Sequence, residues 1–464
     1  MLAGLVAATV VGIAAAAALY SPLPLLLPAG ALAGLAVLRN VRLGVIAALA
    51  LTCVSVEVEF GSLGLDLPVE PVAIGMLGVG VALIAARGRR IEGALLRHPV
   101  TLLLGAHLAW LALTSLTSAY PLTSWKFLLA KLWYVVPFFV VPALVVRRRR
   151  HLRAILLATA VPLTLGLALC IARHAALGFS FEDVNEAVFV LFRNHVTYAA
   201  LASILLPLML VGAWEFPRWS WGRWGLLLAA LVALVAVQTS YTRAAYVGLV
   251  GAAAFVGVVR LRLARPALLV GAGALVAGAA FVVADNRFFG FAPDYERTIT
   301  QESFGDLVEA TYKLEDISTM ERVYRWVAGG YMAGERPWLG WGPGNFPRFY
   351  RGYALEAFRT YVSDNEEGSG IHNYLLMVLV EQGWPGLAIF VALCAAGLLT
   401  AERAYHRART PAARRAVAML TASLAVNLSF QLINDMLESD KSGPWFFFAL
   451  AGLVVLEVEG EVWG

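Results

Sequence analysis

Long apolar runs that alternate with short arginine clusters dominate this chain of 464 residues. Only 14% of the residues are charged, 60% are hydrophobic, and the mean hydropathy is +0.74. A soluble domain carries nearer a quarter charged residues, and a helix needs about 20 apolar residues to span a bilayer. The sequence therefore predicts an all-α polytopic membrane protein. Because the arginines lie between apolar runs, the net charge of +5 does not indicate nucleic-acid binding.

The apolar runs predict 12 to 14 transmembrane helices, the lower number applying if the first two runs form one helical hairpin. The first run has no basic region before it and more runs follow, so we interpret it as a membrane helix and not as a cleaved signal peptide. The three cysteines lie in apolar runs without metal-ligand spacing, and we expect no disulfide. The expected spans are 2–20, 22–38, 43–60, 71–86, 99–118, 125–146, 154–172, 194–213, 224–239, 244–259, 266–285, 372–401 (broken), 416–434 and 444–457.

The arginine clusters predict the orientation of these helices. More than half of the 36 basic residues fall in loops that follow even-numbered spans, whereas alternate loops such as 61–70 are acidic or neutral. Cytoplasmic loops are the ones rich in Lys and Arg. We therefore expect both termini in the cytoplasm and one large periplasmic loop, which divides the chain into residues 1–285, 286–371 and 372–464.

The expected periplasmic loop combines a helical part with a turn-rich aromatic part. Residues 317–335 have helical character, and residues 336–353 are rich in Gly, Pro, Trp, Phe and Tyr. Aromatic side chains beside polar ones suit sugar stacking. Alternatively, these aromatics pack the loop onto the membrane face, where Trp and Tyr are enriched.

Several cations fall near the expected periplasmic ends of the helices: Lys126, Lys131, Arg193, Arg243 and the titratable ring of His372. Charges in such places are costly and usually functional. Arginine forms bidentate bonds to phosphate oxygens, so the set suits a diphosphate. Snorkelling to the headgroups explains Lys126 and Lys131 at least as well. Arg193 and Arg243 have small or polar neighbours, which favours a functional role.

The stretch "IHNYLLMVLVEQGWPGLAIF" (371–390) carries His372 at the mouth of an expected span and a break in its middle. A near-neutral pKa makes His372 a plausible general base for a hydroxyl. Glu381 lies nine residues further on and does not share the helix face of His372. Gly383 can end one helix and Pro385 can start the next. The break either shapes a cavity or simply kinks a long helix.

These motifs together resemble the O-antigen ligase superfamily. His372 and Asn373 are followed by nine residues and then by Gly383 and Gly386, as in that family's His-[Asn/Ser/Gln]-x9-Gly-x-x-Gly pattern. Upstream, "ERVYRW" with Arg322 and Trp326 is similar to the family's Glu-Arg-x3-Trp segment. The Pro-x-x-Gly-x-Gly-x-Gly-Asn-Phe segment that follows ends at Asn345 and Phe346, and "SYTRAAYVGL" resembles the helix start at Arg243. The resemblance covers about residues 190–400.

The resemblance implies an inverting glycosyltransferase of the bacterial inner membrane that uses no nucleotide, no metal and no other cofactor. Its donor would be a glycan on undecaprenyl diphosphate, and its acceptor lipid A core, a growing glycan or a protein hydroxyl. Arg193 and Arg243, the catalytic cations, would hold the diphosphate. His372 would orient or deprotonate the acceptor.

The expected substrate-binding residues complete this site. They are Arg322, which would contact the diphosphate or fix the loop, and Asn373, Asn345, Trp326 and Lys131. We favour a ligase over a polymerase of the same superfamily. A lipid-linked glycan transporter is the alternative from another class, but transporters often show paired repeats and a broken helix in both halves, and here there is one clear break.

Overall fold

The computed structural model describes residues 37, 39–60, 63–87, 91–284, 317–355 and 370–459. In that part of the chain, nine helical segments are long and apolar enough to cross a membrane, which confirms the all-α polytopic fold. The predicted span 2–20 and nearly all of the predicted span 22–38 lie outside it. The longer helices are α4 (Val69–Arg87), α6 (Pro99–Leu116), α7 (Pro121–Val135), α9 (Arg149–Ala176), α11 (His195–Gly212), α12 (Trp221–Thr239), α13 (Arg243–Arg260), α14 (Ala264–Val283), α16 (Ile317–Glu335), α18 (Tyr374–Arg407), α19 (Pro411–Gln431) and α20 (Gly443–Glu459).

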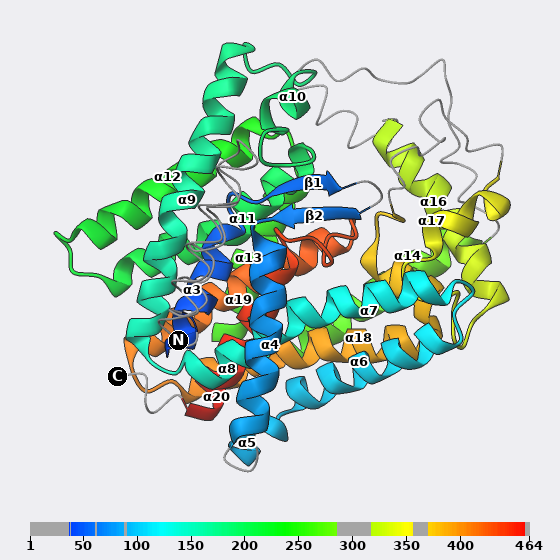
Figure 1. Cartoon of the computed structure of the whole chain (residues 1–464). Helices are drawn as coiled ribbons and strands as arrows, with labels where there is room; N and C mark the ends of the chain where they lie inside the picture. The colour runs from blue at the N-terminus through cyan, green and yellow to red at the C-terminus, as the bar shows by residue number, and fades with distance from the viewer. Residues whose placement is uncertain are drawn as a thin grey trace, which may run out of the picture.

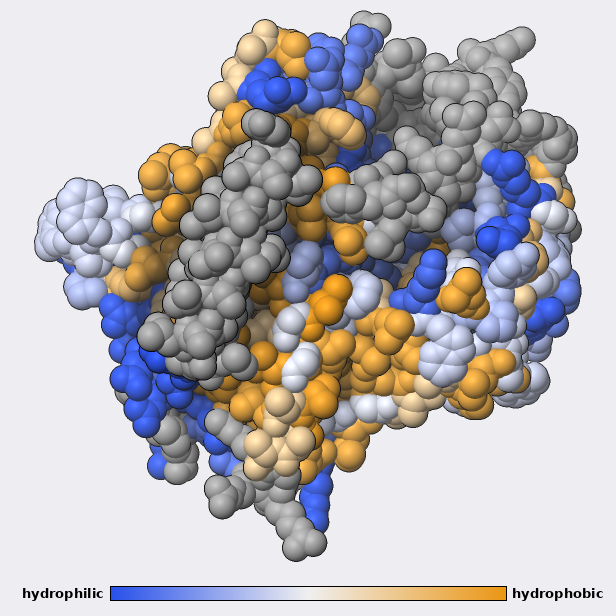
Figure 2. All heavy atoms as spheres, in the orientation of Figure 1, coloured by the Kyte–Doolittle hydropathy of each residue, from blue (hydrophilic) through white to orange (hydrophobic). Residues whose placement is uncertain are grey.

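The helices form one bundle with α16 and the short α17 (Phe346–Phe349) at its upper right in the view of Figure 1. Hydrophobic residues cover the middle of the face shown in Figure 2, and hydrophilic residues gather toward its lower left and its upper right. Such a band is the surface that a bilayer requires. The described parts of the expected periplasmic loop, residues 317–355 and 370–371, contain α16 and α17, in agreement with the short helices predicted there.

Short polar residues set the start of the helices on which the site depends. Asn194 accepts hydrogen bonds from the backbone of Val196 and Thr197, so α11 begins with a capping box. Asn373 caps α18 in the same way, through Leu376 N–H at 2.9 Å. Thr410 caps α19, and Pro411 occupies its first turn, where the missing N–H costs nothing. These caps satisfy donors that would otherwise lie unpaired near apolar surroundings.

The predicted span at residues 43–60 is wrong. The helix α3 (Val41–Leu51) ends early, and the chain then forms an antiparallel hairpin of β1 (Val56–Phe60) and β2 (Leu63–Leu67). The alternation of "VEVEF" has the two-residue period of a strand, which is the signal that the helix prediction overlooked.

A buried ion pair fixes the bend between α3 and the hairpin. Lys441 donates to the carbonyl oxygens of Thr52 and Ser55 at 3.0 and 2.7 Å. Asp440 accepts from the Ser55 hydroxyl and lies 3.2 Å from Lys441 Nζ. Burial raises the pKa of Asp440 to about 7, against the lowering effect of the Lys441 charge. These polar contacts hold the chain in a bend where a straight helix was expected.

The arginine clusters meet at one end of the bundle, which we call the basic end. It is defined by two buried carboxylates and the cations around them. Glu215 accepts from Arg149 at 2.5 Å and from Arg415 at 2.7 Å. Glu457 accepts from Arg403, Arg407 and His98. Clusters that are far apart in the sequence therefore lie on one side, as the predicted orientation requires.

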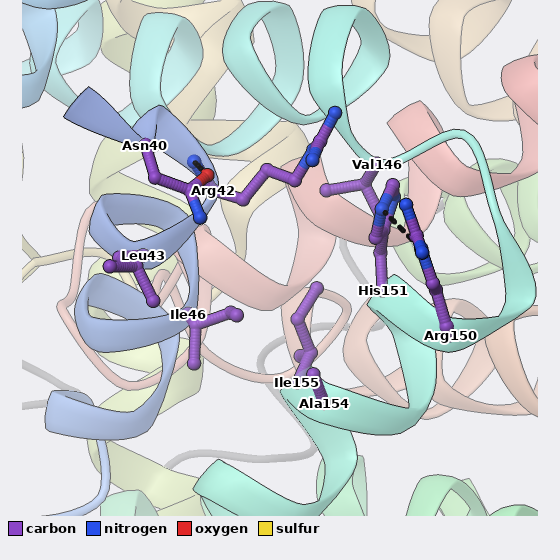
Figure 3. A pocket seen from close by; sticks show the side chains of 9 residues that line it. All are labelled: Asn40, Arg42, Leu43, Ile46, Val146, Arg150, His151, Ala154 and Ile155. Carbon is purple, nitrogen blue, oxygen red and sulfur yellow. Dashed lines mark hydrogen bonds between the residues drawn. The ribbon is translucent and has the colours of Figure 1, made fainter. Parts of the chain in front are cut away.

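A small cavity of about 160 Å³ opens at the basic end between α3 and α9 (Figure 3). Arg42, Arg150 and His151 line it together with apolar side chains of both helices. Arg150 Nε donates to His151 Nε2 at 3.4 Å, the bond dashed in Figure 3. The starts of α11, α13 and α18 lie at the other end of the bundle, so this cavity is separate from the expected site.

We predict that Glu215→Gln destabilises the protein, because it leaves Arg149 and Arg415 without the carboxylate that joins α9, η4 (Ala213–Glu215) and α19. Breaking a buried pair by removing one partner costs about 3 kcal/mol or more. The melting temperature of the purified protein in detergent should fall by several degrees. Glu182→Gln, at an exposed position, should leave it unchanged, and equal melting of both variants would contradict the assigned role.

Candidate functional site

His372 lies in a tight connection immediately before α18. Its backbone φ is +57°, in the left-handed region that few residues adopt without a local reason. Asn373 holds the helix start with its side-chain oxygen, and its amide nitrogen donates to Leu432 O at 2.9 Å. The sequence placed His372 at the mouth of the span, and the structure agrees. The ring itself is about one third exposed, at 29%.

Arg325 on α16 contacts His372 directly. Arg325 Nη1 lies 2.9 Å from His372 Nε2 and 2.9 Å from Gly370 O. A guanidinium only donates, so Nε2 must be the acceptor and the neutral ring carries its proton on Nδ1. Arg325 is almost completely buried, and Glu321 lies one turn before it at 3.7 Å. One buried arginine therefore fixes both the loop and the tautomer of the ring.

Asp435, in the connection from α19 to α20, faces the other side of the ring. Its Oδ1 is 3.9 Å from His372 Nδ1, beyond hydrogen-bond distance but directly toward the proton that the tautomer places there. Backbone N–H groups of Ile371 and His372 stabilise its carboxylate form. Burial raises the pKa of Asp435, against these bonds and the charge of Arg325. The carboxylate thus holds the loop through its backbone and lies close to the imidazole.

The same surroundings keep His372 neutral. Burial, followed by the charges of Arg325 and Arg322, lowers the pKa of His372 to about 3. A neutral ring at physiological pH can accept a proton. In this structure, however, Arg325 occupies the lone pair of Nε2. The ring becomes a base only after Arg325 has moved away.

Arg322, one turn before Trp326 on α16, lies between two parts of the site. Its Nε donates to Ile433 O at 3.3 Å, next to the Leu432 carbonyl that accepts from Asn373. Its charge also acts on His195, the first residue of α11. Trp326 is partly buried against the core, and its indole N–H has no hydrogen-bond partner within the described segments.

The two expected diphosphate cations occupy different surroundings. Arg243 begins α13, directly after Thr242, whose hydroxyl donates to His195 O at 3.4 Å. The starts of α11 and α13 are therefore adjacent, and their positive dipole ends face the same side. Arg193 instead forms an ion pair with Glu57 on β1, and its side chain is mostly exposed. Arg193 is thus matched by a carboxylate that the sequence reading did not assign to it.

Lys131 is not a snorkelling residue and does not lie near a helix end. It is fully buried midway along the span that α7, η3 (Val136–Val140) and α8 (Val141–Val145) form together. Its ammonium donates to Glu438 at 2.5 Å and to the Tyr374 hydroxyl at 3.0 Å. Glu438 neutralises the charge, so in this conformation Lys131 supports the segment after α19 and offers no open contact to a substrate. Lys126, by contrast, is exposed.

Asn345 is also buried, with no exposed surface. Its amide nitrogen donates to Ser118 Oγ at 2.8 Å and to Trp341 O at 3.0 Å. The expected direct contribution of Asn345 to a glycan groove is therefore absent in this conformation. It ties the Gly-rich segment to the connection between α6 and α7.

The break in α18 packs closely against the segment 337–346. Gly383 has φ +69°, and a Cβ there would collide with the backbone of Pro337 and Trp338. Trp384 N–H donates to Pro337 O at 2.8 Å, and Trp341 N–H donates to Val380 O at 3.0 Å. Gly383 thus provides the space for the segment 337–346, and the backbone groups of Val380 and Trp384 bind that segment through hydrogen bonds.

Glu381 completes this seat. Its two carboxylate oxygens accept from Gly344 N–H at 2.8 Å and from Phe346 N–H at 3.0 Å. The residue is 1% exposed, so the two oxygens of a buried carboxyl group are satisfied by backbone donors. The sequence correctly excluded it as a partner of His372 and gave it no other role.

Sequence reasoning missed Arg325, Asp435 and Glu438. Arg325 stands three residues after Arg322 in the same helix, so it was visible as a second cation there. Asp435 and Glu438 stand in "QLINDMLESDKSG" (431–443), where acidic residues separate two apolar runs without an arginine cluster. Such a segment should have been read as a polar connection on the same side as His372.

A family model described as O-antigen ligase matches residues 228–391. The match runs from within α12 to Val391 in α18 and includes Arg243, Arg322, Arg325 and His372. It covers less than half of the chain and confirms the resemblance that the motifs predicted. No curated protein matches the chain.

We predict that Gly383→Ala releases the segment 337–346 from α18, because the added methyl group would occupy the space of the Pro337 and Trp338 backbone at an unfavourable φ. Hydrogen exchange of peptides covering 337–346 should become faster. Gly330→Ala is the matched control, since a Cβ at that position of α16 meets nothing within 4 Å. Unchanged exchange in Gly383→Ala would mean that the break does not seat the segment.

Proposed function

Because residues 228–391 match the O-antigen ligase family, we propose that this membrane protein is an inverting, metal-independent glycosyltransferase of that type. It transfers a glycan from undecaprenyl diphosphate to an acceptor hydroxyl at the periplasmic face. The observation that carries the proposal is the polar cluster of His372, Arg325, Arg322 and Asp435 at the end opposite the arginine clusters. If the basic end faces the cytoplasm, as its arginines favour, this cluster faces the periplasm.

The reaction forms a bond between the acceptor oxygen and the anomeric carbon and breaks the bond from that carbon to the diphosphate. The diphosphate carries two negative charges in the donor and gains a third on the oxygen that leaves the anomeric carbon. Arg243 at the start of α13 and Arg322 on α16 offset this charge, assisted by the dipoles at the starts of α11 and α13. Arg193 contributes once the donor competes with Glu57 for its guanidinium.

His372 receives the proton of the acceptor hydroxyl in this scheme. Its Nε2 is engaged by Arg325 at rest, so arrival of the diphosphate has to draw Arg325 toward the phosphate oxygens and uncover the lone pair. Asp435 then stabilises the imidazolium through Nδ1. The base is therefore available only when the donor is bound, which limits proton transfer without a donor.

A polysaccharide polymerase of the same superfamily is the second candidate function. It would use the same donor and the same polar cluster, and differ only in an acceptor that is itself a lipid-linked glycan. A ligase would accept lipid A core instead. We favour the ligase because that is the description of the matching family.

The function is tested with the purified full-length protein, a lipid-linked glycan donor and a candidate acceptor, in the presence of a chelator. We expect acceptor-dependent release of undecaprenyl diphosphate, and a fall of about 100-fold or more in both His372→Ala and Arg243→Ala. Arg97→Gln, an exposed residue at the basic end, should react like wild type. Movement of the intact donor across the bilayer without bond cleavage would establish a transporter instead.

Arg325→Gln tests the proposed control of His372. The charge of Arg325 disfavours the imidazolium, so its removal should raise the pKa of His372 from about 3 toward the ordinary value of about 6.5. A neutral base is lost as the pH falls through its pKa, so the acid limb of the release rate should begin at a higher pH than in wild type. Arg325→Lys keeps the charge and should keep the limb near its wild-type position. Identical profiles for all three proteins would refute the role of Arg325.

A further inference from the structure

A second cavity lies at the basic end, between α11, α13, α18 and α19. Its volume is about 390 Å³, and it is open on one side. Most of the side chains that line it are apolar, among them Leu206, Leu249, Val256 and Ala418. Its polar side chains are those of Tyr405, Arg260, Arg414 and Arg415. An apolar trough with arginines at one end is what an amphiphilic anion requires.

The trough has the depth of one membrane leaflet. Its lining residues on α13 run from Leu249 to Arg260, a rise of about 16 Å along the helix. The hydrocarbon core of a bilayer is about 30 Å thick, so the trough reaches about halfway across it. On α11 and α19 the lining residues likewise occupy only the half nearest the basic end, Leu206–Val211 and Arg414–Ala422. An acyl chain of a glycerophospholipid spans this same distance, whereas a polyprenyl chain is far longer.

The arginines at the basic end of the trough carry more positive charge than the nearby carboxylates neutralise. Arg415 is already matched, because its Nε donates to Glu215 at 2.7 Å. The other nearby carboxylate, Glu402, accepts the backbone N–H of Ala264 at 2.9 Å. Within the described segments, neither Arg260 nor Arg414 has a carboxylate partner, although Arg414 Nε donates to Ala408 O at 3.2 Å. Two exposed guanidinium groups therefore remain beside the trough.

We propose that this trough binds one anionic glycerophospholipid of the leaflet at the basic end. One acyl chain lies against α11, α13 and α19, and Arg260 and Arg414 hold the phosphate, with the Tyr405 hydroxyl as a further donor. Basic recesses between transmembrane helices are suited to such headgroups. Because the lipid contacts α13 and α18 together, its binding fastens the two helices that carry Arg243 and the His372 loop at their far ends. The lipid takes no part in the proposed reaction, and its site is separate from the donor's.

The test is native mass spectrometry of the full-length protein, stripped of lipid and titrated with phosphatidylglycerol or with phosphatidylcholine of the same acyl chains. Phosphatidylglycerol should bind about tenfold more tightly. The double variant Arg260→Gln/Arg414→Gln should lose this preference, and Arg260→Lys/Arg414→Lys should keep it. Ala253→Phe, which fills the trough, should weaken the binding of both lipids. Arg97→Gln and Val250→Phe, exposed and outside the trough, are the charge and volume controls.

Three outcomes would overturn the proposal: equal affinity for the two phospholipids, wild-type binding by Ala253→Phe, or a preference for undecaprenyl phosphate over phosphatidylglycerol. Equal affinity would mean that the lipids bind without headgroup specificity. Wild-type binding by Ala253→Phe would mean that the lipid binds elsewhere on the surface. A preference for undecaprenyl phosphate would mean that the trough is a second site for the donor lipid. The melting temperature of each variant is measured first, and only variants that melt like wild type are compared, so that loss of fold is not mistaken for loss of a site. The readout needs no glycan donor, so it stands or falls independently of the proposed reaction.

Discussion

The site depends on one constraint: a charge that is taken out of water must be paired. The connection from α19 to α20, residues 432–442, meets this constraint three times. Asp435 faces His372 and Arg325, Glu438 pairs with Lys131, and Asp440 lies beside Lys441. Lys131 comes from α7, His372 and Arg325 come from the start of α18 and from α16, and Lys441 of the connection itself bonds the bend before the hairpin, so a short segment draws these elements together. Replacing any one charge would leave another unpaired in a place where it is costly.

The helix α18 has two structural roles, one at its start and one at its break. Its start carries His372 and Asn373, while Glu381 and Gly383, two to three turns further on, hold the segment 337–346. Since α16 leads directly into that segment, the seat in α18 also limits where Arg322 and Arg325 can lie. The helix break thus affects the position of Arg322 and Arg325 indirectly, because it fixes the segment 337–346 that follows α16. This explains why a flexible glycine and a buried glutamate occur in a helix that crosses a membrane.

The charged residues at the two ends of the bundle have different partners. At the basic end, Glu215 and Glu457 each collect cations from several helices, so that the arginine clusters stabilise the bundle as well as orient it. At the other end, carboxylates also accompany the cations: Asp435 lies near His372, Glu438 pairs with Lys131 and Glu57 pairs with Arg193. The ends differ in which elements their charges join: at the basic end the arginines tie α9, α18 and α19 to Glu215 and Glu457, and at the other end Glu438 and Asp435 tie the connection after α19 to Lys131 and the His372 loop.

The sequence by itself determined the membrane class, most of the spans, the one-sided distribution of arginines and the family motifs around His372. These follow from run length, charge placement and local pattern, which are properties of neighbouring residues. It could not determine that Lys131 pairs with Glu438, that Asn345 is buried, or that the break seats a loop, because each requires contact between residues more than 30 positions apart. The hairpin at 56–67 was readable from its alternation, but the bend before it depends on Lys441, nearly 400 residues later. Only the tertiary structure decided which charges are neutralised within the protein, and therefore which ones remain for a ligand.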